Sequence, residues 1–252
     1  MPTILTLDLG NTSLKGVLWE GAEVIGTFRW IHSSGDPSLG KVPRGKGLPC
    51  RPDAISRVLG VASRGLPREH GIPGLQAGEW VGADLRPPLA VDYCNPEEMG
   101  WDRRVAALAL SHEEKEGGLI LDAGTCLTLT HVDPRGTCRG FGIAPGLAAL
   151  AGSFPAFAPD LDRDFAELPR KFPSAMRSTR QNLEAGIWAA FLGAAEKLLA
   201  FGRGRLAEMG IPPGILRVTG SDGSLLVEAL GEGLLDQLLV HRGLLLLAGE
   251  GS

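Results

Sequence analysis

The chain has 252 residues, of which 44% are hydrophobic and 21% charged, a composition typical of a globular protein with one large or two small domains. Its 25 basic residues are outnumbered by 29 acidic ones, which gives a net charge of −4. Nucleic-acid binding needs clustered basic residues that neutralise phosphates. Because the sequence has no basic block, we do not expect nucleic acid as a partner.

The sequence lacks the signals of secretion and of membrane insertion. The four cysteines form no C-x-x-C pair, and the five histidines form no spaced cluster, so we expect neither a disulfide framework nor a zinc site. The first residues lack the basic start and apolar core of a signal peptide. The longest uncharged run, 140–159, contains prolines that would break a spanning helix. We therefore expect a cytoplasmic protein without a membrane segment.

The first half of the chain predicts a β-meander followed by helices. Alternating apolar residues predict the strands, and short Gly-containing turns separate them. Apolar residues at helical spacing predict the helices. The strands are expected at 3–9, 14–19 and 23–31, a Gly, Pro and Ser-rich loop at 33–52, and helices at 53–65 and 101–110.

The pattern restarts after Gly117-Gly118. Residues 119–132 repeat the strand, acid, small-residue turn and strand of residues 5–18, which indicates two copies of one unit. We therefore expect one domain over 1–117 and a second over 118–252. In the second half we expect helices at 179–200, 225–230 and 234–239, and a strand at 215–218 that runs into a Gly-rich turn.

Each copy places an acid at the end of its first strand, directly before a tight turn. A carboxylate beside backbone N–H groups suits a hydrated divalent cation and a phosphate chain, so Asp8 is expected to face Mg²⁺ through water. The phosphate oxygens would be bound by Gly10, Asn11, Thr12, Ser13 and Lys15, which follow it. An ordinary hairpin turn uses the same residue types, so this motif alone leaves both interpretations open.

The second copy, Asp122-Ala-Gly-Thr125, and the later turn Thr219-Gly-Ser-Asp-Gly223 complete a pattern of three segments. The pattern resembles the phosphate 1, phosphate 2 and adenosine segments of the superfamily that contains acetate kinase, sugar kinases, Hsp70 and actin. No Walker P-loop or G-x-G-x-x-G dinucleotide motif competes with it.

Within that superfamily the chain resembles type III pantothenate kinase, the family first described as Bvg accessory factor proteins. Each matching segment is weak alone, but all occur in the family's order between residue 4 and about residue 225. They are Asp8-Leu-Gly-Asn-Thr12, Gly82-Ala-Asp-Leu-Arg-Pro87, Tyr93 with Asn95-Pro96, Gly100-Trp-Asp-Arg103, Asp122-Ala-Gly-Thr125, Ile143-Ala-Pro-Gly-Leu147, Leu168-Pro169, and Thr179 with Gly186. The resemblance implies an α/β fold of two ribonuclease-H-like, actin-like ATPase domains, with ATP and Mg²⁺ in an interdomain cleft.

The resemblance also implies a role for each matching residue. Asp102 is similar to the general base that takes the proton of pantothenate's primary hydroxyl, which suits phosphoryl transfer because positioning and one carboxylate are most of what the protein must supply. The implied substrate-binding residues are Tyr93, Gly100, Trp101, Arg103 and, from the partner subunit of a homodimer, Thr179. Thr125 and Gly220 are the implied ATP contacts, and Asp122 the ligand of a monovalent cation, K⁺ or NH₄⁺.

Plain structural interpretations stay open for several of these residues. Asp102 with Arg103 suits the first turn of a helix, Thr179 a helix N-cap, and Tyr93 a core position. The chain also departs from the family pattern. Cys126 and Thr130 replace an Ala and an Asp, and Phe141 and Ser221 replace glycines, so one carboxylate near the cation site is lost.

The resemblance implies ATP-dependent phosphorylation of pantothenate to 4′-phosphopantothenate, the first step of coenzyme A biosynthesis. The expected partners are ATP, pantothenate and a second copy of the chain, with the apolar helix at 179–200 as the interface. Two alternatives remain. One is another small-acid or sugar kinase of the same superfamily, and the other is a non-catalytic nucleotide-binding regulator, an interpretation that Thr130 and Ser221 keep open.

Overall fold

The computed structural model describes residues 2–31, 48, 50–63, 72, 74–75, 77–154, 158–161 and 171–249. The chain forms two compact units, Met1–Glu113 with Leu238–Ser252, and Glu114–Gln237. The sequence led us to expect the whole C-terminal part in the second domain, whereas the last helix belongs to the first unit. The segment Leu168-Pro169 and most of the loop expected at 33–52 lie outside the described residues.

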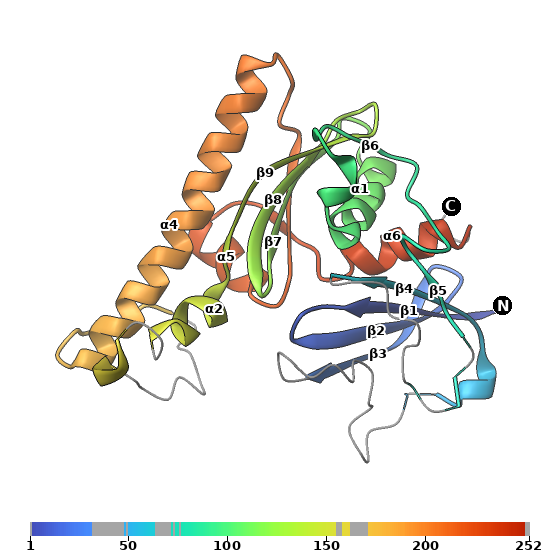
Figure 1. Ribbon diagram of the computed structural model, residues 1–252, viewed down its shortest axis with the longest axis horizontal. Coiled ribbons are helices and arrows are strands. Elements are labelled where there is room, and N and C mark those ends of the chain that lie inside the picture. The colour runs from blue at the N-terminus through green and yellow to red at the C-terminus, as the bar shows by residue number, and fades with distance from the viewer. Residues whose placement is uncertain are drawn as a thin grey trace. The chain divides into compact units, whose positions relative to one another are not determined.

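The first unit contains a five-stranded sheet in the order β3-β2-β1-β4-β5 (Figure 1). Its strands are β1 (Thr3–Leu9), β2 (Ser13–Glu20), β3 (Glu23–Ile31), β4 (Ile55–Ala62) and β5 (Glu79–Trp80). The antiparallel pairing of β1 with β2 and of β2 with β3 confirms the predicted meander. β1 and β4 are parallel, so their carboxyl ends meet at one edge, where Leu9 pairs with Ala62.

The helix predicted over 53–65 is wrong, because residues 55–62 form strand β4. This strand lies between β1 and β5, and its last five residues are all buried. A strand covered on both faces has a continuous apolar run rather than an alternating one. The run Val58-Leu-Gly-Val-Ala62 has that form, which apolar spacing alone cannot distinguish from a buried helix.

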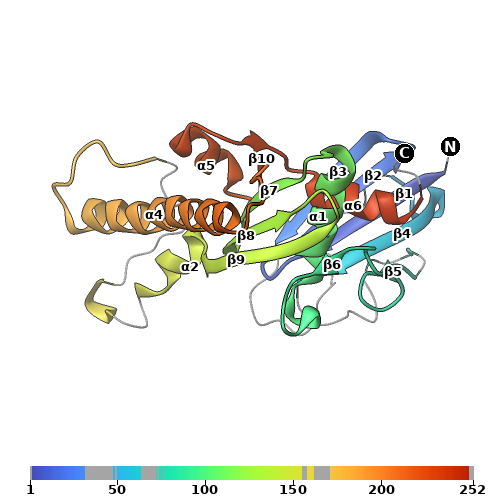
Figure 2. The same ribbon diagram turned by 90° about the horizontal axis from the view of Figure 1, so that it is seen from above.

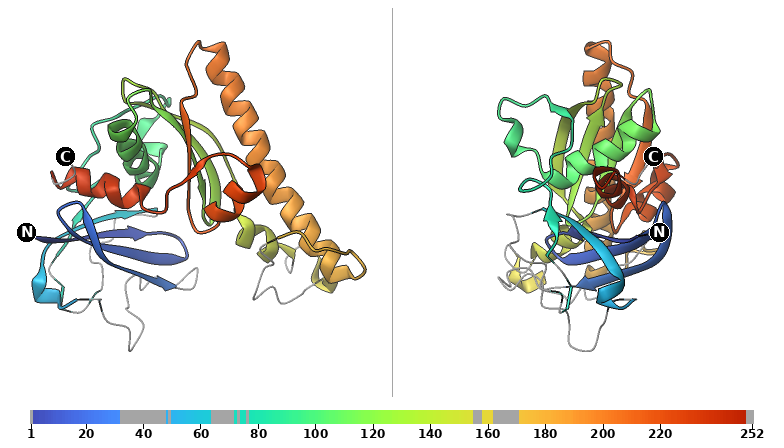
Figure 3. Two further views of the ribbon diagram at one scale, coloured as in Figure 1. Left: turned by 180° about the vertical axis from the view of Figure 1, so that it is seen from behind. Right: turned by 90° about the vertical axis from the view of Figure 1, so that its right-hand side faces the viewer.

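Helices α1 (Trp101–Glu113) and α6 (Leu239–Leu247) pack against each other and against this sheet (Figure 3). A Cβ atom on Gly243 would collide with the carbonyl oxygen of Val105, so the two helices approach closely there. α1 confirms the predicted helix at 101–110. The short elements of this unit are η1 (Pro52–Ala54), β6 (Ala90–Val91) and η2 (Pro96–Glu98).

The second unit repeats the strand arrangement of the first. Its own strands are β7 (Gly118–Ala123), β8 (Cys126–Val132), β9 (Thr137–Pro145), β10 (Ile215–Thr219) and β11 (Leu234–Leu235), in the order β11-β10-β7-β8-β9. Counted within each unit, both sheets have the order 3-2-1-4-5, with an antiparallel meander and two parallel strands. The repeat inferred from sequence is therefore a repeat of the fold. The helix expected at 234–239 is wrong, since β11 and a turn occupy residues 234–238 and only Leu239 is helical, as the first residue of α6.

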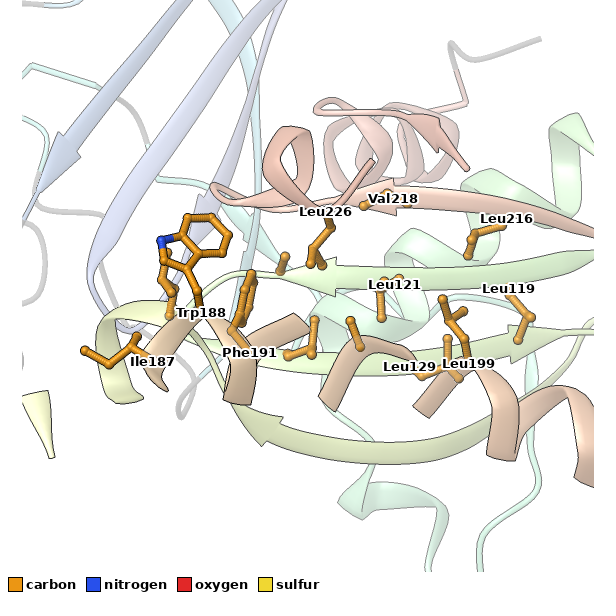
Figure 4. Packing of buried hydrophobic residues seen from close by; sticks show 14 of the residues in the cluster. Leu119, Leu121, Leu129, Ile187, Trp188, Phe191, Leu199, Leu216, Val218 and Leu226 are labelled. Atoms are coloured by element: carbon orange, nitrogen blue, oxygen red, sulfur yellow. The ribbon is translucent and has the colours of Figure 1, made fainter. Parts of the chain in front are cut away.

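The helices of the second unit are α2 (Leu147–Gly152), η3 (Pro159–Leu161), α4 (Thr179–Glu208) and α5 (Gly223–Leu230). α4 is longer than the helix expected at 179–200, and it runs along the sheet (Figure 2). Trp188, Phe191 and Leu199 of this helix belong to one buried apolar cluster with Leu121 and Leu129 of the sheet (Figure 4). α4 is also long and apolar enough to cross a membrane by length and composition, although 33% of that apolar window is buried in the unit.

Candidate active site

The turn after β1 combines a charge pair with a buried, unsatisfied oxygen. The hairpin register places Lys15 directly opposite Asp8, and its Nζ lies 3.4 Å from Asp8 Oδ2. The Gly10 N–H donates to the Ser13 carbonyl at 3.0 Å and closes the turn. Asn11 Oδ1 is buried and has no hydrogen-bond partner among the described residues. Buried acceptors of this kind are rare without a ligand or water, so the turn has the donors, the acceptor and the charge for a phosphate with a hydrated cation.

Asp102 lies in the first turn of α1, in the same unit as Asp8. Its Oδ2 accepts a hydrogen bond from Ser63 Oγ at 3.0 Å, and its Oδ1 accepts one from the Arg103 N–H at 2.8 Å. A Cβ atom on Gly100 would lie 2.5 Å from Asp102 Oδ1, so a glycine is needed to leave room for the carboxylate. Burial, and next the negative charge of Asp8, raise the pKa of Asp102. A carboxyl with a raised pKa in such a place is suited to accept a proton.

Of the residues expected to bind substrate, Tyr93, Gly100, Trp101 and Arg103 lie in the same unit as this carboxylate, whereas Thr179 lies in the second unit. The Arg103 guanidinium donates to Tyr93 Oη at 3.3 Å. The Trp101 ring carries the Arg104 guanidinium at 4.1 Å from its centroid, and a Cβ atom on Gly82 would lie 2.5 Å from its Nε1. The structure therefore fixes the Trp101 ring between a cation and the backbone.

In the second unit, three turns meet at the loop between β7 and β8. Gly220 has φ +88°, and a Cβ atom there would lie 2.5 Å from Asp122 Oδ1 and would collide with the Ala123 carbonyl oxygen. The Gly146 N–H donates to the Thr125 carbonyl at 3.0 Å. The segments expected to bind the second phosphate and the adenosine therefore lie side by side within this unit.

Two other expected residues have different surroundings. Thr179 is the first residue of α4, but the N-cap is Ser178, whose Oγ accepts from the Gln181 N–H at 3.2 Å. The alternative of Thr179 as the cap is therefore wrong, and its side chain is exposed. Thr130 is buried on β8, at the position where the family pattern has an acid.

Sequence reasoning missed Ser63, which donates to Asp102, and Arg104, which covers Trp101. A serine directly after a buried parallel strand lies at the edge where ligands bind in α/β sheets. That signal was present, but it required residues 55–62 to be recognised as a strand.

A metal cage made only of protein side chains is not found in the part of the chain that the structure describes, where no three His, Cys, Asp or Glu side chains gather. Mg²⁺ that arrives with a nucleotide takes one or two carboxylates and otherwise phosphate oxygens and water. Asp8 with the unsatisfied Asn11 oxygen fits that donor set. Cys50, Cys94, Cys126 and Cys138 are free thiols.

Known proteins are similar to this chain over most of its length. The sequence model of the type III pantothenate kinase family matches residues 61–200. A protein of that name from Zymomonas mobilis is 30% identical over 218 residues, which cover 77% of this chain and 74% of that one. Another from Brevibacillus brevis is 27% identical over 255 residues, 97% of each chain. The solved structure of an archaeal actin homologue superposes with a TM-score of 0.50 at 13% identity over 99% of this chain and 100% of that one. The actin-like α/β fold expected from the sequence is confirmed.

Proposed function

Because the chain belongs to the type III pantothenate kinase family, we propose that it phosphorylates pantothenate with ATP to give 4′-phosphopantothenate, the first step of coenzyme A biosynthesis. The observation that carries this proposal is the Asp102 carboxylate. It lies in the first unit with the turn at Asp8, burial and Asp8 raise its pKa, and it belongs to the matched segment. This is the side chain that phosphoryl transfer to an alcohol requires.

Asp102 acts as the general base. It accepts the proton of the primary hydroxyl as that oxygen bonds to the γ-phosphorus. The bond from this phosphorus to the bridging oxygen breaks, and ADP leaves with the electron pair. The raised pKa of Asp102 favours the transfer, because a more basic carboxylate binds the proton more firmly. Gly100 has no side chain, which leaves room for the Asp102 carboxylate. Arg103, Tyr93 and Trp101 contact the substrate.

The phosphate side uses the first hairpin and the loops of the second unit. Mg²⁺ bound with ATP supplies positive charge against the phosphates, and Asp8 with Asn11 would hold it, through water at Asp8. Lys15, Thr12 and Ser13 donate to phosphate oxygens, while Gly10 shapes the turn, because its N–H already donates to the Ser13 carbonyl. Thr125 and Gly220 contact the nucleotide, and Asp122 binds K⁺ or NH₄⁺.

The active species is a cytoplasmic homodimer, with α4 as its interface and Thr179 completing the partner's pocket. The support is the exposed apolar surface of this helix and its C-cap, where Phe201 and the capping residue Met209 keep 57% and 45% of their accessible area. A second copy that covers this surface would also explain the apolar composition of α4 without a membrane. Phe201→Glu should dissociate the dimer in sedimentation and lower the specific activity, and a fully active monomer would contradict the assignment.

ADP release with and without pantothenate tests the reaction itself. Stimulation by pantothenate, lost in Asp102→Asn, supports the proposed kinase. Stimulation only by another alcohol or acid would point to a related kinase of the superfamily. ATP binding without stimulation by any acceptor would point to the nucleotide-binding regulator.

A further inference from the structure

Ser63 lies where the two parallel strands of the first unit end. It directly follows β4, and its backbone N–H donates to the Leu9 carbonyl at 3.0 Å, so it is held against the last residue of β1. Asp8 is the neighbour of Leu9 in the chain. The carboxyl ends of parallel strands are where α/β folds place ligands, and Ser63 has no part in the mechanism described above.

The Ser63 side chain contacts the carboxylate of the proposed base, Asp102. Its Oγ donates to Asp102 Oδ2 at 3.0 Å, and the Arg103 N–H holds the other oxygen at 2.8 Å. Gly100, beside Oδ1, has no side chain that could restrain the carboxylate. The Ser63 hydroxyl is therefore a side-chain donor that restrains the rotation of this carboxylate, and each oxygen, with two lone pairs, can accept a second hydrogen atom besides the bond named here.

We propose that Ser63 is a positioning residue for the phosphoryl transfer, whose hydroxyl holds the Asp102 carboxylate ionised and oriented toward the acceptor hydroxyl. The proposal rests on the proposed role of Asp102 as the general base. Ser63 itself exchanges no proton with the substrate and acts through Asp102.

Electrostatics supports the assignment independently of the orientation. Burial and the charge of Asp8 raise the pKa of Asp102, while the hydrogen bonds from the Arg103 N–H and from Ser63 lower it. A hydrogen bond from a hydroxyl to an ionised carboxylate is stronger than one between two neutral groups. Without it the carboxyl would stay protonated to a higher pH and would lose its fixed direction. The lost direction lowers kcat at every pH, the higher pKa lowers it on the acidic limb, where less of the carboxyl is ionised, and neither changes the contacts of the ATP phosphates.

The test compares Ser63→Ala with Ser63→Thr, which keeps the hydroxyl. Ser56→Ala is the matched control, because Ser56 lies on the same strand and donates to the Thr3 carbonyl on the exposed side. In Ser63→Ala we expect kcat to fall about tenfold and the acidic limb of the kcat profile to move to higher pH, with KM for ATP within about twofold. Ser63→Thr should restore both values to within about threefold of wild type, and Ser56→Ala should match wild type.

Two outcomes would overturn the proposal: an unchanged kcat and acidic limb in Ser63→Ala, or a loss in Ser63→Thr as large as that in Ser63→Ala. If Ser63→Ala also has a lowered melting temperature, Ser63→Thr and the pH profile decide between the two explanations. A loss of stability alone would not move the acidic limb of the kcat profile. Asp102→Asn separates a failure of the proposed base from a failure of the proposed positioning residue. If that variant keeps activity, the proposed base is wrong, whereas an inactive Asp102→Asn with a wild-type Ser63→Ala refutes only the positioning role.

Discussion

The hairpins β1–β2 and β7–β8 have the same backbone plan and different side chains opposite their acids. In the first, Lys15 lies opposite Asp8 and pairs with it. In the second, the residue opposite Asp122 is Thr128, which is uncharged. A turn with an acid and a lysine can take a phosphate together with its cation, whereas an acid facing a threonine favours a cation. In the proposed mechanism, this one cross-strand position separates a phosphate-binding hairpin from a cation-binding hairpin on a repeated backbone.

The interiors of the two hairpins differ as well. Thr6, two residues before Asp8, accepts a hydrogen bond from Trp19 Nε1 at 2.9 Å, and its Oγ1 lies 3.0 Å from His241 Nδ1. The equivalent position in the second hairpin is Ile120, two residues before Asp122. The first hairpin is thus tied through a buried polar network to α6, which explains why the last residues of the chain belong to its unit.

The largest expected effect is on the acid of the first hairpin. Asp8→Ala should lower kcat by on the order of a thousandfold or more, because the charge that faces the cation and phosphates is lost. The fold should persist, since Asp8 contributes a charge pair rather than apolar packing. Asp53→Ala is the control, an exposed acid paired with Arg51 in the same unit, and should leave the rate unchanged. Asp8→Ala activity within a few-fold of wild type, at saturating Mg·ATP, would break the assignment of this hairpin.

The polar network predicts a loss of stability in acid. Burial lowers the pKa of His241 to about 3, whereas unfolded histidine titrates near 6.5. The unfolded state therefore gains the proton first as the pH falls, and stability that is complete above pH 6.5 is lost toward pH 3. Between pH 6.5 and 4.5 the expected loss is roughly 2 kcal/mol. Urea unfolding should show that His241→Gln, although less stable at pH 7.5, lacks this part of the pH dependence. Parallel curves for the two proteins would contradict the buried neutral imidazole.

Two glycines of the second unit test whether the turn at Gly220 contacts the β7–β8 hairpin. Gly220 and Gly231 both have positive φ, but a Cβ atom on Gly231 meets no atom within 4 Å, whereas one on Gly220 collides with the backbone at Ala123. Gly231→Ala should therefore cost about 1 kcal/mol from strain alone, and Gly220→Ala about 2 kcal/mol more from overpacking. Gly220→Ala should also weaken nucleotide binding, because it displaces Asp122. Thermal melts and ATP titration check both, and equal melting temperatures would mean that the turns are not in contact.

The repeated hairpins were predictable because each has alternating apolar residues and an interrupting turn, and α1 and α4 because they have a clear helical period. β4 was not, since a strand buried on both faces has no alternation. β9 was missed because Gly140 and Gly142 interrupt its apolar pattern and it carries a bulge. α6 was missed, and the helix expected at 234–239 ends where α6 begins, because leucines occur on both sides of Leu239.

The residues proposed for the site lie in short motifs, so the sequence could single them out as candidates, whereas it could not predict the contacts that support them. Ser63 and Asp102 are 39 residues apart, and Thr6 and His241 are 235 apart. Local sequence patterns reach only a few residues, so such pairs appear only when strand order and helix packing are known. The cross-strand partner of each acid could be predicted from the sequence, because a tight hairpin fixes the register of its two strands.

The smallest expected effect concerns the monovalent cation at the second hairpin. Thr130 lies opposite Ile120 and so diagonally from Asp122 on the same face of the β7–β8 pair, and it is buried. Because diagonal neighbours on a sheet are about 7–8 Å apart, an acid at 130 would act on a cation at Asp122 through its charge. We expect wild type to be activated a few-fold more by KCl than by NaCl at constant ionic strength, Asp122→Asn to lose that difference, and Thr130→Asp to reach half-activation at lower K⁺. Thr130→Asp should also melt lower in Na⁺ and recover in K⁺, because a buried carboxylate without a counter-charge is unfavourable. Equal wild-type rates in K⁺ and Na⁺ would remove the cation from the second hairpin, and the contrast between the two acids would then concern the nucleotide alone.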